Sequence, residues 1–290
     1  MWENVEYQIR LSTNRKFSIE KSRPIGGGCI NDASCVTGNG QSYFVKTNSQ
    51  SDPEIFRAEF KALEEISKSD CIRVPKPVCY GSGGGYSFLV MEYLELTPAK
   101  GSRSWVDLGV NLARLHKVSS RRFGWVMDNV IGSTPQPNKE CEDWISFFRD
   151  QRLGHQLKLA QEKGVQFDGA DTLLDGLERF FQDYAPRPSL LHGDLWNGNV
   201  GFLKSGEPVI FDPATYFGDR EAEFGIIEMF GGFAPEFYQG YHSEWPLDQG
   251  FSSRKDLYLL YHQLNHFNLF GHGYLAGCRA TLKKCLKSVS

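Results

Sequence analysis

The chain has 290 residues, of which 40% are hydrophobic and 23% are charged. These fractions are typical of a soluble globular protein, and they exclude a disordered or fibrous chain. Thirty-two basic residues against 35 acidic ones leave a net charge of −3, which argues against a protein that binds nucleic acid through a basic surface. A chain of this length predicts about two domains.

The hydrophobic pattern and the cysteines predict a cytoplasmic protein with no membrane segment. The N-terminus, MWENVEYQIR, lacks the basic segment and apolar run of a secretory signal. No apolar run approaches the length of about 18 residues that indicates a membrane span. The seven cysteines are odd in number and form no CxxC pair, which favours a reduced intracellular protein and argues against a zinc site.

The first third of the chain predicts a β-rich unit with one helix. The expected strands are residues 17–20, 34–37, 42–47 and 86–91, which are rich in aromatic or β-branched side chains. Pro53 marks the first turn of the expected helix, since apolar residues then recur at helical spacing. The segment 74–85 is expected to be a turn-rich connection, with the glycine run 83–85 as a hairpin turn.

The rest of the chain predicts a mainly helical unit. The expected helices are residues 106–116, 144–159 and 172–184, with more helix after Asp219. A loop–strand–turn–strand segment over 190–214 interrupts them. The change of pattern predicts an α+β protein with two domains, residues 1–92 and residues 93–290.

The most informative segment is HGDLWNGN, residues 192–199, followed by a second aspartate, Asp212, after an apolar strand. Phosphoryl transfer needs a carboxylate near the acceptor hydroxyl and oxygen ligands that hold Mg²⁺ against the phosphates. Asp194 suits the first role, and Asn199 and Asp212 suit the second, because an amide and carboxylates are hard oxygen ligands. The spacing is that of a kinase catalytic loop and its metal-binding aspartate. The alternative is a pair of polar turns, each capped by an aspartate.

Three further kinase-like features precede this segment in the expected order. The glycines Gly26, Gly27 and Gly28 would let the backbone approach a phosphate. Lys46 lies in an expected strand, where its ammonium would reach the phosphates of ATP, and Glu59 in the next helix would pair with it. Each feature alone has a simpler explanation, namely a hairpin turn, a solvated lysine and a surface helix charge. Their order is what favours the kinase interpretation.

At these residues the sequence resembles the fructosamine kinase family, also called ketosamine 3-kinases, which is related to aminoglycoside and choline kinases. The resemblance extends over nearly the whole chain, and HGDLWNGN with its tryptophan is its most specific part. It implies a two-lobed protein-kinase-like fold with a small antiparallel β lobe and a larger helical lobe. It also implies transfer of the γ-phosphate of ATP, with Mg²⁺, to the 3-hydroxyl of a ketosamine, which leads to deglycation.

The resemblance assigns roles to individual residues. Asp194 resembles the proton acceptor, Asn199 and Asp212 the Mg²⁺ ligands, and Lys46 with Glu59 the phosphate lysine and its partner. The family's hinge, which binds adenine through backbone groups, corresponds to Glu92, Tyr93 and Leu94.

The acceptor site is expected to include Trp144, Phe148, Arg152 and Trp196, since aromatic faces cover the apolar side of a sugar or amine. Core packing explains Trp144 and Phe148 equally well, because they lie four residues apart. Asp219 stands where related sequences often carry histidine, and its position after the metal aspartate makes it a candidate for sugar preference.

Cys29 lies in the glycine loop, where backbone amides and a neighbouring lysine would lower the pKa of its thiol. An intermolecular or a mixed disulfide at this position would distort the loop and switch off ATP binding. The sequence therefore leaves open a monomer or a redox-dependent dimer. An inert small residue in a tight loop is the equal alternative.

Two other functions remain open at this stage. One is a kinase of an aminoglycoside, choline or a plain sugar. The other is a non-catalytic, redox-responsive pseudokinase, against which the intact Lys46, Asp194, Asn199 and Asp212 argue. The expected partners are ketosamines, either small molecules or glycated proteins, and the sugar could be ribulosamine, erythrulosamine or fructosamine.

Overall fold

The computed structural model describes residues 1–26, 31–49 and 53–289. The predictions for Gly27, Gly28 and Cys29 therefore lie outside the described residues. The chain forms two compact units: a first unit of Met1–Lys100 with Gly201–Pro213, and a second unit of Gly101–Val200 with the chain from Ala214 onward. Within the described ranges, no helix is long and apolar enough to cross a membrane.

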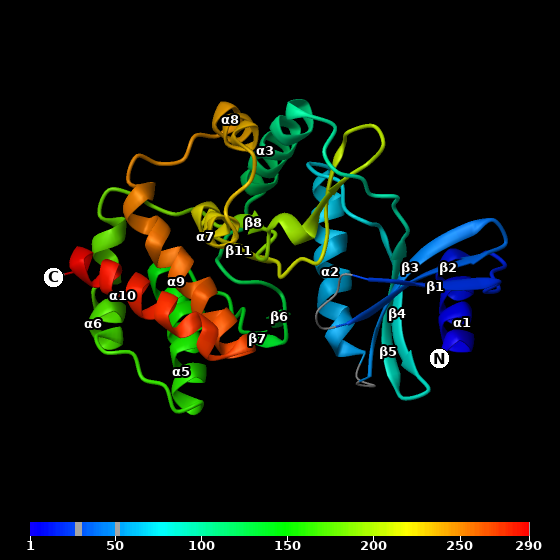
Figure 1. Cartoon of the computed structure of the whole chain (residues 1–290), viewed down its shortest axis with the longest axis horizontal. Helices are drawn as coiled ribbons and strands as arrows, with labels where there is room; N and C mark the ends of the chain where they lie inside the picture. Colours follow the sequence, from blue (N-terminus) through cyan, green and yellow to red (C-terminus); the bar gives the residue numbers. More distant parts are fainter. Residues whose placement is uncertain (27–30, 50–52, 290) are drawn as a thin grey trace. The chain divides into compact units, whose positions relative to one another are not determined.

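The first unit is built on a five-stranded antiparallel sheet, in the order β1-β2-β3-β5-β4 (Figure 1). Its strands are β1 (Lys21–Ile25), β2 (Asp32–Gly38), β3 (Gln41–Asn48), β4 (Pro77–Gly83) and β5 (Tyr86–Glu92). Its helices are α1 (Trp2–Thr13) and α2 (Glu54–Ser69). The returning segment adds the short strand β10 (Pro208–Ile210), paired with β9 (Val200–Phe202).

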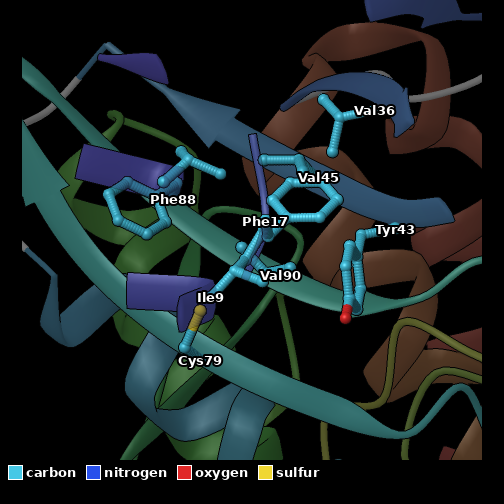
Figure 2. Close-up of a cluster of buried hydrophobic side chains, with 9 residues drawn as sticks. Ile9, Phe17, Val36, Tyr43, Val45, Cys79, Phe88 and Val90 are labelled. Carbon is cyan, nitrogen blue, oxygen red and sulfur yellow. The ribbon is translucent and has the colours of Figure 1, made fainter. Parts of the chain in front are cut away.

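Strand β3 separates two environments because successive side chains point to opposite faces of a sheet. Val45 joins Ile9 of α1 and the strand residues Val36 and Val90 in a buried cluster (Figure 2). Phe17 and Tyr43 meet edge to face in the same cluster, with ring centroids 5.1 Å apart. Lys46, the next residue, therefore faces the opposite side, where it meets α2.

Three expectations for the first unit are wrong. Its described residues form two helices, α1 and α2, where one was expected. The strand expected at residues 17–20 is irregular chain, and β1 begins at Lys21 instead. Phe17 is buried in the cluster although it lies in this irregular segment, so an apolar residue here does not indicate a strand. The segment 74–85 contains β4, whose pairing with β5 is irregular between Pro77 and Cys79. The proline and glycine residues of this segment favour turns, and for that reason β4 was not predicted. The hairpin at Gly84 and Gly85 is as expected.

The second unit is mainly helical (Figure 1). Its α-helices are α3 (Ser102–Lys117), α4 (Trp144–Phe148), α5 (Gly154–Glu162), α6 (Ala170–Asp175), α7 (Glu223–Met229), α8 (Pro235–Glu244), α9 (Phe251–Phe270) and α10 (Leu275–Val289). Its short strands are β6 (Asn129–Ile131) paired with β7 (Thr134–Gln136), and β8 (Ser189–Leu191) paired with β11 (Tyr216–Gly218). Single helical turns occur at Leu177–Phe181, Asn197–Asn199, Arg220–Ala222 and His272–Tyr274.

Helices α3 and α8 pack with their backbones in direct contact. A Cβ atom on Gly109 of α3 would lie 2.0 Å from the carbonyl oxygen of Phe237 in α8. A Cβ atom on Gly240 of α8 would lie 2.2 Å from the carbonyl oxygen of Val106 in α3. Glycine at both positions is therefore what allows this close crossing.

Two of the expected helices are interrupted. The helix expected at 144–159 contains a π-helical turn, Arg149–Leu153, between α4 and α5. The helix expected at 172–184 is divided at Gly176 into α6 and the turn Leu177–Phe181. The spacing of apolar residues alone does not distinguish a continuous helix from one whose direction changes at a π-helical turn or at a glycine.

Candidate active site

Lys46 is the centre of the site in the first unit. Its ammonium Nζ lies 2.7 Å from Oε1 of Glu59 in α2 and 2.6 Å from Oδ1 of Asp212. Burial alone would lower the pKa of Lys46, but the carboxylates of Asp212 and Glu59 outweigh this effect and raise the pKa above its ordinary value. The predicted Lys46–Glu59 pair is present, and Asp212 is a second partner.

Asp212 reaches Lys46 because of how the returning segment is held. β10 lies beside Arg73, whose carbonyl accepts a hydrogen bond from the amide of Ile210 at 3.0 Å. Two residues later Asp212 has φ of 60°, a left-handed conformation that is uncommon for a residue with a side chain. Such a conformation persists only where the surrounding structure enforces it, and it is concentrated at functional sites.

The expected hinge begins at the end of β5. The Glu92 carboxylate accepts hydrogen bonds from Nη2 of Arg73 at 2.6 and 2.5 Å, so its side chain is held by the protein. The Glu92 amide donates to the carbonyl of Lys76 at 2.8 Å. The Tyr93 hydroxyl lies 3.2 Å from Nη2 of Arg23 in β1. These bonds fix the course of the chain at Glu92 and Tyr93.

The catalytic-loop candidate follows β8 in the second unit. Gly193 has φ of 85°, and a Cβ there would lie 2.1 Å from the carbonyl oxygen of Ala214. Glycine is therefore required directly before Asp194. The Ala214 amide donates to the carbonyl of His192 at 2.9 Å, which ties the loop to the chain before β11. Asp194 itself is only partly buried.

The predicted metal ligands have suitable chemistry. The amide nitrogen of Asn199 donates to the backbone carbonyl of Asp194 at 2.8 Å. Because a carbonyl only accepts, this bond identifies the nitrogen end of the amide and leaves the oxygen end for a cation. The Asp212 side chain keeps 43% of its surface exposed while it holds Lys46. An amide oxygen and a carboxylate suit Mg²⁺. Among the described residues, no group of three or more His, Cys, Asp or Glu is placed to hold a metal.

Glu223, at the start of α7, is a site residue that the sequence analysis missed. Its buried carboxylate accepts hydrogen bonds from the backbone amides of His192 at 2.7 Å and Gly193 at 3.0 Å. Nε2 of His116 lies 3.5 Å from Oε2 of Glu223, the oxygen that accepts from the His192 amide. Burial opposes the ionised form, but His116 and the loop amide hold the pKa of Glu223 below its ordinary value. The ionised Glu223 carboxylate thus holds the backbone just before Asp194 in place.

No sequence signal distinguishes Glu223 from the other acids after Asp219. The sequence does not predict a contact between His116 and Glu223 either, because His116 ends an amphipathic helix more than a hundred residues earlier. Its Nδ1 lies 2.8 Å from the hydroxyl of Tyr241, which also accepts a hydrogen bond from Arg220 at 3.2 Å. Only the three-dimensional fold brings these groups to the loop.

The residues predicted to contact the acceptor fall into two groups. Trp144, Phe148 and Arg152 are almost completely buried, whereas Trp196 is partly exposed. The Arg152 guanidinium lies 3.9 Å from the ring centroid of Tyr216 and donates to Asn138 and to backbone carbonyls. This burial favours the core interpretation of Trp144 and Phe148, and it gives Arg152 an interior role as well.

Asp219 is also completely buried. Its carboxylate accepts hydrogen bonds from the hydroxyls of Tyr184 at 2.8 Å and Tyr258 at 2.5 Å, and from the amide of Glu221 at 3.1 Å. Burial raises its pKa. These contacts favour a structural role for Asp219 that joins α9 to the chain after β11, rather than a direct contact with a sugar.

Comparison with known families gives the site its context. The model of the family described as fructosamine kinase matches residues 1–288. The chain belongs to the fructosamine kinase family. The resemblance found in the sequence is thereby confirmed, and with it the assignment to a family of ATP-using kinases.

Two relatives illustrate the similarity of this fructosamine kinase family member to known sequences. A Synechocystis sp. protein named as a probable ketoamine kinase is 46% identical over 288 residues, covering 99% of this chain and 97% of the relative. A chloroplastic protein-ribulosamine 3-kinase of Oryza sativa subsp. japonica is 43% identical over 283 residues, covering 96% of this chain and 82% of the relative.

Solved structures confirm the predicted α+β kinase-like fold. The crystal structure of a Haemophilus somnus protein, provisionally named a fructosamine-3-kinase, matches with a TM-score of 0.91 and 29% identity over 99% of this chain and 98% of that one. The aminoglycoside phosphotransferase APH(4)-Ia matches with a TM-score of 0.64 and 15% identity over 100% of this chain and 98% of that one. The second match shows the shared fold alone.

Proposed function

We propose that this fructosamine kinase family protein transfers the γ-phosphate of ATP to the 3-hydroxyl of a ketoamine. In the reaction, the bond between the γ-phosphorus and the oxygen of the ADP leaving group breaks. A bond from phosphorus to the sugar oxygen forms, and the proton of the hydroxyl passes to a carboxylate. The observation that supports the proposal most is the buried Lys46 held by both Glu59 and Asp212.

The first unit supplies the groups proposed for ATP. The ammonium of Lys46 attracts the phosphates, and Glu59 keeps it oriented. Gly26 and its neighbours in the glycine cluster are proposed to lie against the phosphates, and the backbone from Glu92 to Leu94 to hold the adenine. Asp212 is the Mg²⁺ ligand proposed in this unit; Asn199, the other predicted ligand, belongs to the second unit. When bound, Mg²⁺ would neutralise the charge of the phosphate oxygens.

The second unit supplies the group proposed for the acceptor. Asp194 accepts the hydroxyl proton, and the tie from Asn199 to its carbonyl keeps the loop in one conformation. Trp196, two residues later and partly exposed, is proposed to cover the apolar side of the substrate. Positioning of the two substrates accounts for most of the catalysis in this scheme.

A ribulosamine is the proposed first substrate, because the rice relative is a protein-ribulosamine 3-kinase and is 43% identical to this chain. Erythrulosamine and fructosamine remain in the substrate panel. The functional division at residue 92, the cytoplasmic location, the choice between monomer and redox-dependent dimer, and the redox role of Cys29 stay predictions.

The test is a panel of ketosamines offered with Mg-ATP and measured as ADP release and as sugar phosphate. It includes ribulosyl-, erythrulosyl- and fructosyl-lysine, with choline and kanamycin as acceptors for the alternative kinases. We expect ketosamine-dependent turnover and no turnover with choline or kanamycin. The Asp194→Asn variant should bind ATP as the wild type does and lose nearly all transfer, because its amide cannot accept the proton.

Turnover of Asp194→Asn within a few-fold of the wild type would exclude Asp194 as the proton acceptor. ATP binding without transfer to any ketosamine would support the pseudokinase alternative. Phosphorylation of kanamycin or choline in preference to every ketosamine would overturn the proposed substrate class.

A further inference from the structure

The β6–β7 hairpin and the chain just after it carry three side-chain amides that contact the segment entering β11. We call them the amide cluster; it consists of Asn129, Gln136 and Asn138. Nε2 of Gln136 donates to the backbone carbonyl of Ala214 at 3.0 Å, and Nδ2 of Asn129 donates to that of Thr215 at 2.8 Å. Because a carbonyl only accepts, these bonds identify the nitrogen end of both amides.

The oxygen ends of the amide cluster are also paired. Oδ1 of Asn129 accepts from Gln136 at 2.7 Å and from Asn138 at 2.8 Å. Oε1 of Gln136 accepts from the hydroxyl of Tyr261 in α9 at 2.7 Å, and Oδ1 of Asn138 accepts from Arg152 at 2.6 Å. Gln136 and Asn138 are both buried. A buried network in which donors and acceptors match in this way is rigid and has a single arrangement.

Ala214 connects the amide cluster to the catalytic-loop candidate within the second unit. Its amide donates to the carbonyl of His192 at 2.9 Å. Its carbonyl oxygen, which Gln136 holds, is the atom that a Cβ at Gly193 would approach to 2.1 Å. A shift of this carbonyl therefore acts directly on the backbone that precedes Asp194.

The chain is held at three consecutive residues as it enters β11. Gln136 binds the carbonyl of Ala214, Asn129 binds the carbonyl of Thr215, and the Arg152 guanidinium lies 3.9 Å from the ring centroid of Tyr216. Arg152 also bonds the amide cluster through Asn138. Its interior position thus serves the same segment.

We propose that Gln136 is a positioning residue for the catalytic loop. By holding the carbonyl of Ala214, it keeps the backbone at Gly193, and with it the Asp194 carboxylate, in the orientation that accepts the hydroxyl proton. The inference rests on the proposed function. If Gln136 turned away from Ala214, the Tyr261 hydroxyl would lose its acceptor, and an unpaired buried polar group is costly. A displacement of a reacting group by about 1 Å lowers a rate by about a hundredfold.

The experiment replaces Gln136 by methionine, which keeps the length of the side chain and removes its amide. We expect kcat with ribulosyl-lysine and Mg-ATP to fall by about ten- to a hundredfold. The KM for ATP should change less than twofold, because the groups proposed for ATP belong to the first unit. Steady-state kinetics well below the unfolding temperature of each variant measures both constants.

Gln156→Met is the matched control in the same unit. Gln156 is 1% exposed and Gln136 is 2% exposed, so each substitution removes a buried amide. The Gln156 amide bonds Asn265 and Asn268 of α9 rather than the segment at Ala214. Its loss should lower stability and leave kcat within about threefold of the wild type.

Hydrogen exchange of the Ala214 backbone amide tests the positioning without any substrate. Since this amide bonds His192, we expect its exchange to be about tenfold faster in Gln136→Met than in the wild type and unchanged in Gln156→Met. Asn129→Ala, at a partly exposed position, is a milder second variant, and it should change kcat and exchange in the same direction.

Equal losses of kcat in Gln136→Met and Gln156→Met would overturn the positioning role, as would unchanged exchange at Ala214 in Gln136→Met and Asn129→Ala. A wild type that phosphorylates no ketosamine would instead contradict the proposed function. In that case the exchange at Ala214 would still decide whether Gln136 holds the loop.

Discussion

Lys46 shows how the fold holds a buried cation. An isolated buried ammonium is unfavourable, and it normally loses its charge unless it is paired and hydrogen-bonded. Here two carboxylates approach it from different segments, Glu59 from α2 and Asp212 from the returning chain. The lysine therefore stays charged and fixed in position before any nucleotide arrives.

Much of the site could be predicted from the sequence at the residue scale, for a physical reason. Asp194, Asn199 and Asp212 lie within 19 residues and follow a short strand, so local spacing already limits their geometry. Lys46 lies on a strand and Glu59 on the helix that follows it, so local spacing limits their relative positions in the same way. Burial could not be predicted in this way, because Arg152 and Asp219 owe their interior positions to elements far along the chain, including α9.

Glu223→Gln tests whether the hydrogen bonds from the loop amides to the Glu223 carboxylate position the catalytic loop. A glutamine oxygen can accept from one of the two loop amides, but its amide group cannot accept from the other. We expect kcat to fall by roughly ten- to a hundredfold through misplacement of Asp194, while the KM for ATP changes less than twofold. Steady-state kinetics well below the unfolding temperature measures both constants.

Glu223→Asp keeps the charge and should recover part of the lost kcat, which a purely structural defect would not do. Glu228→Gln, in the same helix, is the matched control, since Glu228 bonds Tyr238 and Lys255 rather than the loop. A kcat for Glu223→Gln within twofold of the wild type would show that these hydrogen bonds to Glu223 are not needed for turnover.

At the scale of elements, the existence of long helices follows from periodicity, whereas their interruptions do not. α2 and α3 agree with expectation because each has one uninterrupted apolar face against its own unit. The π-helical turn at Arg149–Leu153 leaves the apolar spacing of the sequence almost unchanged. β1 was missed because Lys-Ser-Arg-Pro-Ile is an edge strand with almost no buried face.

Gly109→Ala tests the close crossing of α3 and α8. The added methyl group would meet the backbone of Phe237, which cannot move aside as a flexible side chain can. We expect the free energy of unfolding to fall by about 1–3 kcal/mol, even though alanine favours the helical state more than glycine does. Thermal or urea unfolding followed by circular dichroism measures the change.

Gly273→Ala is the control for this substitution, because a Cβ atom at Gly273 meets nothing within 4 Å. Its effect should stay within about 0.5 kcal/mol. If Gly109→Ala is no more destabilising than Gly273→Ala, the crossing tolerates a methyl group and the close backbone contact is not required.

At the scale of the whole molecule, buried histidines make stability depend on pH. Burial lowers the pKa of His116, His262 and His266, and for His262 the charges of His266 and Arg152 add to the effect. In the unfolded chain a histidine binds a proton below about pH 6.5. The unfolded state then binds more protons than the folded state, so stability is complete above that pH and is lost as the pH falls below it.

We therefore expect the free energy of unfolding to fall between pH 7 and pH 5, with each histidine contributing at most about 1.4 kcal/mol per pH unit. His262→Gln should make this slope shallower in urea titrations at several pH values. His242→Gln, at an exposed position in α8, is the control. A slope unchanged in His262→Gln would mean that His262 is not among the groups responsible.

The course of the chain through the first unit has a consequence for biosynthesis. The segment Gly201–Pro213 belongs to this unit, yet it follows Lys100 by a hundred residues that build the other unit. At about 5–20 residues per second, Asp212 leaves the ribosome on the order of ten seconds after β5 and α2. Of the two carboxylates that contact Lys46 in the structure, Glu59 alone has been made during that interval. The nascent first unit therefore lacks β10 and the Asp212 carboxylate until late in synthesis. The lysine site is complete only after most of the protein has been made.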